Sequence, residues 1–182
     1  MASTVSLQAL EAALAGQKRP PVHLWHPDKV GSIDIRIDRE GRWFHEGGEI
    51  RREALVRLFS SILRREGDRH YLVTPAEKLA IDVAVAPFLA ISVKRAKDEQ
   101  GRDVFVFMTN IGDEIAAGPE HRLQVQENPG NGEPLPLLHV RDGLQALLSR
   151  PVFYELAGYG DIDGNTLTLQ SAGERFVLGV IE

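Results

Sequence analysis

A strict alternation of apolar and charged residues constrains the fold more than any other feature of this sequence. In residues 33–38, three isoleucines alternate with two aspartates and an arginine, which is the period of a half-buried β-strand. Gly41 follows in a short polar turn, and the chain returns through the aromatic residues Trp43 and Phe44. We therefore predict a β-hairpin over residues 33–45.

Further periodic segments predict an α+β protein. Leucine, isoleucine and phenylalanine recur at helical spacing in residues 55–63, which predicts an amphipathic helix that stops near Gly67. Period-two alternation predicts a meander of antiparallel strands over residues 79–108, after a turn at residues 74–78. The remaining predicted elements are a strand at 122–126, a loop at 128–134, a helix at 142–149, and strands at 152–156, 166–170 and 176–181.

The two predicted helices share a sequence pattern at a constant offset. Residues 52–60 and residues 141–149 have the same amino acid at four of nine positions. Because this offset is about half the chain, we predict two related β-rich halves, each with one main helix packed on antiparallel strands. The alternative is two ordinary amphipathic helices with the same leucine spacing. The predicted parts are an N-terminal arm or short helix at 1–19, a first α+β repeat at 20–85 and a second repeat at 86–182.

Composition excludes several classes of protein. The net charge of −5 disfavours nucleic acid as a partner. The chain has no cysteine, which excludes disulfides, thiolate metal sites and thiol nucleophiles and fits a reducing, cytoplasmic location. No apolar run is long enough to span a bilayer, so we expect no membrane span. No glycine motif for a nucleotide is complete, and no cofactor is expected.

Several motifs occur together in an order that is typical of one family. They include Trp25-His26-Pro27, residues 72–78 and residues 150–156. Over residues 20–182 the sequence resembles the bacterial domain-of-unknown-function 1285 family. The resemblance implies a duplicated α+β arrangement, a C-terminal half like a pleckstrin-homology fold, and a binding site between the halves, with a role in signal transduction. It implies no enzymatic activity.

Arginines near predicted strand faces and helix starts suggest an anion site. Arg36 projects from the face of its strand opposite the isoleucines, where it is either an ordinary surface charge or a forked donor for a carboxylate or phosphate. Arg52 and Arg141 each precede a predicted helix, where a cation is disfavoured unless an anion or a nearby acid compensates it. Internal ion pairs are the alternative to an anion site. The candidate ligand-binding residues are Arg36, Trp43, Arg52, Glu77, Lys78, Asn110 and Arg141.

Catalytic and metal chemistry have weaker support in the sequence. His23 and His26 lie near Asp28, but two or three such residues on one loop are poor evidence for zinc, and we expect no metal. We predict no catalytic residues. The sequence thus favours a non-enzymatic module that binds a small molecule or anion between its halves. The alternative is a protein-interaction adaptor that uses its C-terminal half, since sheet edges can bind peptides.

Overall fold

The computed structural model describes residues 20–182, so the predicted arm at residues 1–19 lies outside the described part. The chain divides after Pro87 into two compact units, which we call the N-terminal and C-terminal domains. The N-terminal domain contains η1 (Val22–Leu24), β1 (Val30–Ile37), β2 (Trp43–His45), β3 (Gly48–Glu49), α2 (Glu53–Ser60), β4 (Leu63–Glu66), β5 (Arg69–Val73) and β6 (Lys78–Val83). The C-terminal domain contains β7 (Phe88–Lys97), β8 (Asp103–Thr109), β9 (Glu114–Ala116), β10 (Leu123–Glu127), β11 (Pro134–Arg141), β12 (Leu144–Leu148), α3 (Arg150–Ala157), β13 (Asp161–Asp163), β14 (Thr166–Ser171) and β15 (Glu174–Val180).

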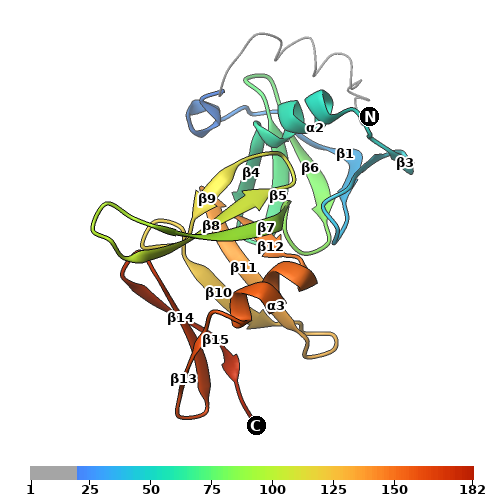
Figure 1. The fold of residues 1–182 in the computed structure, drawn as a ribbon. Helices are drawn as coiled ribbons and strands as arrows, with labels where there is room; N and C mark the ends of the chain where they lie inside the picture. Colours follow the sequence, from blue (N-terminus) through green and yellow to red (C-terminus); the bar gives the residue numbers. More distant parts are fainter. Residues whose placement is uncertain (1–19) are drawn as a thin grey trace. The chain divides into compact units, whose positions relative to one another are not determined.

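Each domain is built on a six-stranded sheet, and the two sheets have the same topology (Figure 1). The strand order is β3-β2-β1-β6-β5-β4 in the N-terminal domain and β9-β8-β7-β12-β11-β10 in the C-terminal domain. In both, the first and last strands of the six-stranded sheet, β1 with β6 and β7 with β12, form the single parallel pair among otherwise antiparallel described neighbours. The prediction of two related halves is therefore confirmed, and the sheet carries the relationship.

A turn at the end of the first hairpin repeats in both domains. Asp38 accepts hydrogen bonds at Oδ1 from the backbone N–H groups of Glu40 and Arg42, at 3.0 and 2.9 Å, and at Oδ2 from Nε of Arg42 at 2.8 Å. Asp98 accepts the same three bonds from Gln100 and Arg102, at 3.0, 2.9 and 2.8 Å. The glycine before each arginine has a φ of 76°, which favours glycine on steric grounds.

The helices, in contrast, occupy different places in the two domains. In the N-terminal domain α2 lies between the third and fourth strands, and its Phe59 ring packs against Trp43 with the ring centroids 6.2 Å apart. In the C-terminal domain the corresponding connection, residues 117–122, is not helical. Instead α3 follows the sixth strand and packs on β7 through the buried face that contains Val152 and Leu156. The sequence match based on two helices is therefore wrong.

The predicted helix at residues 142–149 is a strand. Asp142 and Gly143 form a tight turn with φ values of 49° and 76°, and β12 follows between β11 and β7. A central strand is buried on both faces, so its leucines do not alternate with polar residues and imitate a helical pattern. Conversely, residues 152–156 were expected to be a strand and belong to α3 instead. Pro151 opens this helix, because its missing N–H would be unpaired there anyway.

Two smaller differences concern the first helix and the central meander. The helix ends at Ser60, because Leu63 begins β4 and pairs with Leu72 of β5. The expected meander over residues 79–108 is interrupted, since β6 belongs to the N-terminal sheet and β7 to the C-terminal sheet. The hairpin of β1 and β2 forms as predicted, and the strand that pairs with β14 is β13 rather than residues 152–156. The pleckstrin-homology likeness of the C-terminal half stays a prediction. Within residues 20–182, no helix is both long and apolar enough to cross a lipid bilayer.

Candidate functional site

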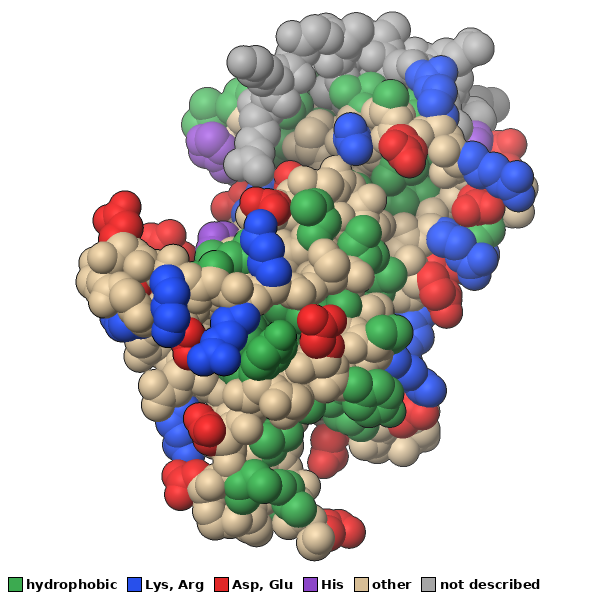
Figure 2. Space-filling view, in the orientation of Figure 1, with side chains coloured by type: hydrophobic (Ala, Val, Ile, Leu, Met, Phe, Trp, Pro, Cys, Tyr) green, Lys and Arg blue, Asp and Glu red, His purple; other side chains and the backbone are tan. Residues whose placement is uncertain are grey.

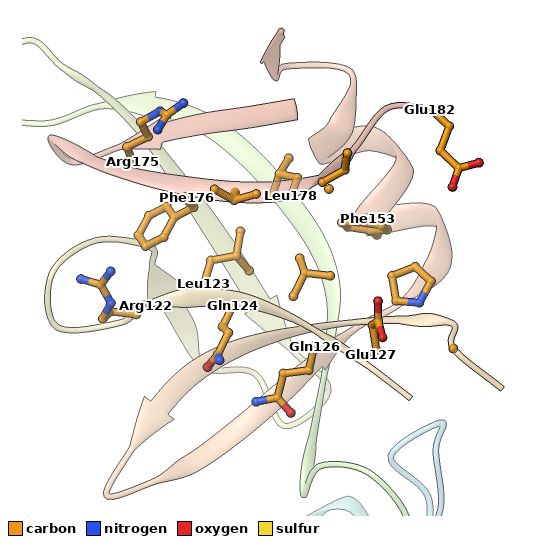
Figure 3. A pocket seen from close by; sticks show the side chains of 16 residues that line it. Arg122, Leu123, Gln124, Gln126, Glu127, Phe153, Arg175, Phe176, Leu178 and Glu182 are labelled. Atoms are coloured by element: carbon orange, nitrogen blue, oxygen red, sulfur yellow. The ribbon is translucent and has the colours of Figure 1, made fainter. Parts of the chain in front are cut away.

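A groove of about 740 Å³ lies within the C-terminal domain, between β10, β15 and α3 (Figure 3). Leu123 of β10 and Phe176 of β15 point toward each other across it, and both side chains are buried. Leu178 and Phe153 extend this apolar lining along β15 and α3. The groove therefore has a hydrophobic floor, which is typical of sites that hold an apolar ligand surface.

β10 is the edge strand of its sheet. At every second residue its backbone N–H and C=O groups point away from β11, its one neighbour in that sheet. Arg122 and Asn128, on either side of β10, both exchange backbone hydrogen bonds with the β11 side. Residues alternate along an antiparallel ladder, so the N–H and C=O groups of Leu123, Val125 and Glu127 point out of the sheet. Among the described residues none of these groups has a backbone partner in β15. An unpaired edge thus borders the groove.

The two ends of the groove carry opposite charges. Arg122 and Arg175 lie at one end, and Glu127 and Glu182 lie at the other (Figure 3). Both arginines are engaged on the surface: Arg122 with Glu174 at 3.1 Å and Arg175 with Asp163 at 2.8 Å. No ion pair of Glu127 is found within residues 20–182. The acidic end is therefore the better placed to receive a new charged partner.

Two of the predicted ligand residues in the N-terminal domain lie on opposite faces of its sheet. Arg36 is exposed on β1, and its guanidinium carbon lies 4.3 Å from the centre of the Phe44 ring. Trp43 is 1% exposed and belongs to the core beneath α2. Arg52 is exposed and occupies the N-cap position of α2, where its side chain makes no capping hydrogen bond. These three side chains do not gather around one point.

Glu77 and Lys78 are adjacent in sequence but engage different partners. Glu77 is buried, and its Oε2 lies 3.2 Å from Nζ of Lys29. Lys78 has its Nζ 2.7 Å from Oε2 of Glu66 and 4.8 Å from the centre of the Tyr71 ring. Both residues therefore form ion pairs within the N-terminal domain.

The remaining two predicted residues belong to the C-terminal domain. Asn110 joins the start of β7 to the end of β8, because its Oδ1 accepts from Leu89 N–H at 3.0 Å and its own N–H donates to Leu89 O at 2.8 Å. Arg141 ends β11 rather than preceding a helix, and its guanidinium carbon lies 5.3 Å from the Phe88 ring centre. The helix-start argument for Arg141 is thus wrong, and the cleft between the halves stays a prediction.

The sequence prediction missed the groove. The signal was present in the alternation of Leu123 and Val125 with glutamines, and of Phe176 and Leu178 with exposed residues. That alternation predicts strands with one apolar face, but it does not indicate that both strands lie at sheet edges, because edge position depends on the pairing of distant segments.

The pKa values of His70 and Asp103 are both lowered, for different reasons. Burial, together with the positive charge of Arg65, lowers the pKa of His70 below its ordinary value of 6.5. Hydrogen bonds from Arg95 and Lys97 lower the pKa of Asp103 from 3.8 to about 2. In the described part of the chain, no three His, Asp or Glu side chains are grouped so that they could hold a metal ion.

Comparisons with known proteins agree with this two-domain architecture. The N-terminal domain of the "Domain of unknown function (DUF1285)" family matches residues 20–86, and the C-terminal domain of that family matches residues 87–178. The chain therefore belongs to the DUF1285 family. No protein among the curated ones matches it.

Two crystal structures of DUF1285 family proteins are similar to this chain. The one from Silicibacter pomeroyi DSS-3 is 45% identical, with a TM-score of 0.90 over 98% of this chain and 97% of that protein. The one from Shewanella baltica OS155 is 24% identical, with a TM-score of 0.53 over 68% of this chain and 90% of that protein, and it supports the fold alone.

Proposed function

We propose that this protein is a non-enzymatic binding module that holds an extended peptide segment of a partner protein in the groove of its C-terminal domain. The observation that carries the proposal is the unpaired edge of β10 beside a groove with a hydrophobic floor and charged ends. An exposed strand edge is a template for another strand, and main-chain hydrogen bonds then supply affinity without a fixed sequence.

The lining indicates what kind of peptide fits. A strand added to β10 would direct every second side chain into the groove, toward Phe176 and Leu178. Apolar residues at alternate positions would therefore be preferred. Glu127 at one end favours a basic peptide residue there, because a charged rim selects partners and speeds association.

A proline at Val125 tests the hydrogen-bonding role of the edge. The Val125 N–H points away from β11, so its loss removes a donor for an added strand but no bond within the protein. Proline is tolerated in edge strands at such positions. Peptides selected from a random display library on the full chain are measured by calorimetry against wild type and Val125→Pro. We expect the selected peptides to alternate apolar residues and to lose binding to Val125→Pro.

The control is Val125→Ala, which keeps the backbone donor and shortens only the side chain. Circular dichroism checks that all variants keep their strand content. Selection of no peptide, or equal binding of the selected peptides to Val125→Pro and Val125→Ala, contradicts strand addition.

A small molecule or anion bound by the arginines is the second candidate function. Its support is that the guanidinium groups of Arg36 and Arg141 each lie over an aromatic ring, at 4.3 and 5.3 Å from the centre, which orients them. A thermal-shift screen with nucleotides, phosphates and organic acids tests it. A hit that survives in Arg36→Ala and Arg141→Ala contradicts this candidate.

The proposal includes a cytoplasmic location and a role in signal transduction. The absence of cysteine supports a reducing compartment. Peptide recognition by a module without catalytic groups is a common requirement of signalling complexes. Fractionation of cells that express the tagged chain measures the location directly, and recovery outside the cytoplasm contradicts it.

A further inference from the structure

A second hollow in the C-terminal domain, of about 720 Å³, has a polar lining. It lies against the end of the β7–β8 hairpin. Figure 1 labels these two strands, and Figure 2, in the same orientation, shows Lys and Arg side chains along the hairpin. The loop after α3 and the β14–β15 turn close its other sides. Its volume falls in the range of small-molecule sites.

The duplicated topology shows that this charged lining replaces a hydrophobic core. The shared turn aligns Asp38 with Asp98, and the strand pairs on either side keep the same register. The buried cross-strand pair Ile37 and Trp43 in the N-terminal domain thus corresponds to Lys97 and Asp103. In the N-terminal domain α2 covers this face, through the contact of Phe59 with Trp43, whereas no helix follows the third strand of the C-terminal domain.

Two of the cations in the hollow share one carboxylate. Arg95 and Lys97 both pair with Asp103, at 2.6 and 2.7 Å. Because these hydrogen bonds keep the carboxylate ionised, one negative charge faces two positive ones. Arg102 is a third lining cation, and Asp98, which lies outside the lining, compensates its charge at 2.8 Å.

An aromatic ring and bare backbone complete the hollow. Tyr159 is 41% exposed, and its ring centre lies 5.2 Å from that of the buried Phe105. Gly160 beside it has no room for a side chain, since a Cβ there would lie 2.7 Å from the Leu167 side chain. Asp161 is the other lining carboxylate, so together with Asp98 the hollow has three acids beside its three cations.

We propose that this hollow binds a small organic anion that carries a planar ring. Arg95 and Lys97 hold the anionic group, a phosphate or a carboxylate, through charge-assisted hydrogen bonds. Tyr159 provides the surface on which the ring stacks. This site lies apart from the peptide groove, because none of these three residues lines that groove.

Two lysines on β7 provide a matched pair of variants. Lys97 is 63% exposed and pairs with Asp103, whereas Lys94 is 64% exposed and pairs with Glu114 at 3.1 Å, outside the hollow. Both Lys97→Gln and Lys94→Gln remove one charge and one surface ion pair. They differ in whether the charge lines the hollow, so a general effect of net charge appears in both.

Phenyl phosphate and benzoate serve as probes in a ¹H–¹⁵N NMR titration of the full chain, with inorganic phosphate and phenol as single-feature controls. We expect saturable chemical-shift changes at Tyr159 and Gly160 for phenyl phosphate or benzoate. The probe that binds more tightly shows whether the hollow prefers a phosphate or a carboxylate. Affinity is expected to fall about tenfold in Lys97→Gln, as for loss of one charged hydrogen bond, and to stay unchanged in Lys94→Gln.

Three outcomes overturn the proposal. One is the absence of saturable shifts with both probes up to about 10 mM, a concentration that detects even very weak sites. Another is equal affinity in Lys97→Gln and Lys94→Gln. The third is that inorganic phosphate binds as tightly as phenyl phosphate, both to wild type and to Tyr159→Leu. The phenyl ring of the probe would then contribute nothing to binding.

Discussion

Replacing Asp38 by alanine perturbs the turn that both domains share, and the structure gives the size of the effect. Asp38 is 7% exposed and accepts two backbone N–H groups at 3.0 and 2.9 Å. Each such bond is worth about 1 kcal/mol net, and leaving the N–H groups unpaired adds to the cost. The Arg42 guanidinium contributes little, because it is 55% exposed and screened by solvent. We expect Asp38→Ala to lower the free energy of unfolding of the N-terminal domain by about 2–3 kcal/mol.

Tryptophan fluorescence is the assay that isolates this domain. The chain has two tryptophans, Trp25 and Trp43, and both belong to the N-terminal domain. With a slope of about 1 kcal/mol per molar urea for a small domain, the unfolding midpoint is expected to fall by about 2 M. Asp38→Asn keeps an acceptor oxygen for the backbone and is expected to lose less than half as much.

The reasoning is refuted by an Asp38→Ala midpoint that matches wild type, or by equal losses in the alanine and asparagine variants. The matched change in the C-terminal domain is Asp98→Ala, whose carboxylate makes the same three contacts. It is expected to destabilise that domain in the same direction, as measured by hydrogen exchange of the β7 and β8 amides.

The other predictions concern a glycine and two titratable groups. Gly160→Ala is expected to cost about 1–3 kcal/mol by overpacking, whereas Gly179→Ala, which meets no atom within 4 Å, is tolerated; similar melting temperatures for the two variants contradict the close approach at Gly160. His70 has a lowered pKa, so the unfolded chain binds a proton that the folded chain does not, and stability falls as pH drops below about 6.5. Urea midpoints measured from about pH 7 to pH 5 are expected to decrease less in His70→Gln, and an unchanged slope rules out this origin. Asp103 has its pKa lowered to about 2, so its contribution to stability is full above about pH 4 and is lost as pH falls through 2. Carboxyl NMR is expected to show a midpoint near 2 for Asp103, and an ordinary midpoint there shows that the ion pairs do not form in solution.

Alternation of apolar and polar residues predicted strands that have one buried face. It could not predict β12, which is buried on both faces. The hairpin around Gly41 was predictable because each strand has one polar face. β12 was not, because it lies between two neighbours and its leucines do not alternate. Pro151 then seemed to end a helix, although it begins one. A proline can therefore indicate the end of the preceding helix or the start of the following one, and the local sequence does not decide between them.

The duplication was predicted from the wrong residues. The leucine pattern at residues 141–149 led to a helix pairing that the sheets do not support, whereas the repeated turn of Asp38 and Asp98 was visible but too short to stand out. For the candidate site, Glu77 and Lys78 were named as ligand-binding residues, and each forms an ion pair with a residue of its own domain. The groove and the charged hollow depend on how distant strands pair, which local patterns do not encode.

The parallel pairing of the first and last strands has a consequence for synthesis on the ribosome. β1 emerges early but has to await β6 before its inner edge is covered, and β7 waits in the same way for β12. Loop closure over such separations is slow compared with hairpin formation. Each nascent domain therefore exposes an unpaired strand edge until the last strand of its six-stranded sheet leaves the exit tunnel. A chain truncated just before residue 78 is expected to need chaperone protection that a chain extended past residue 87 does not.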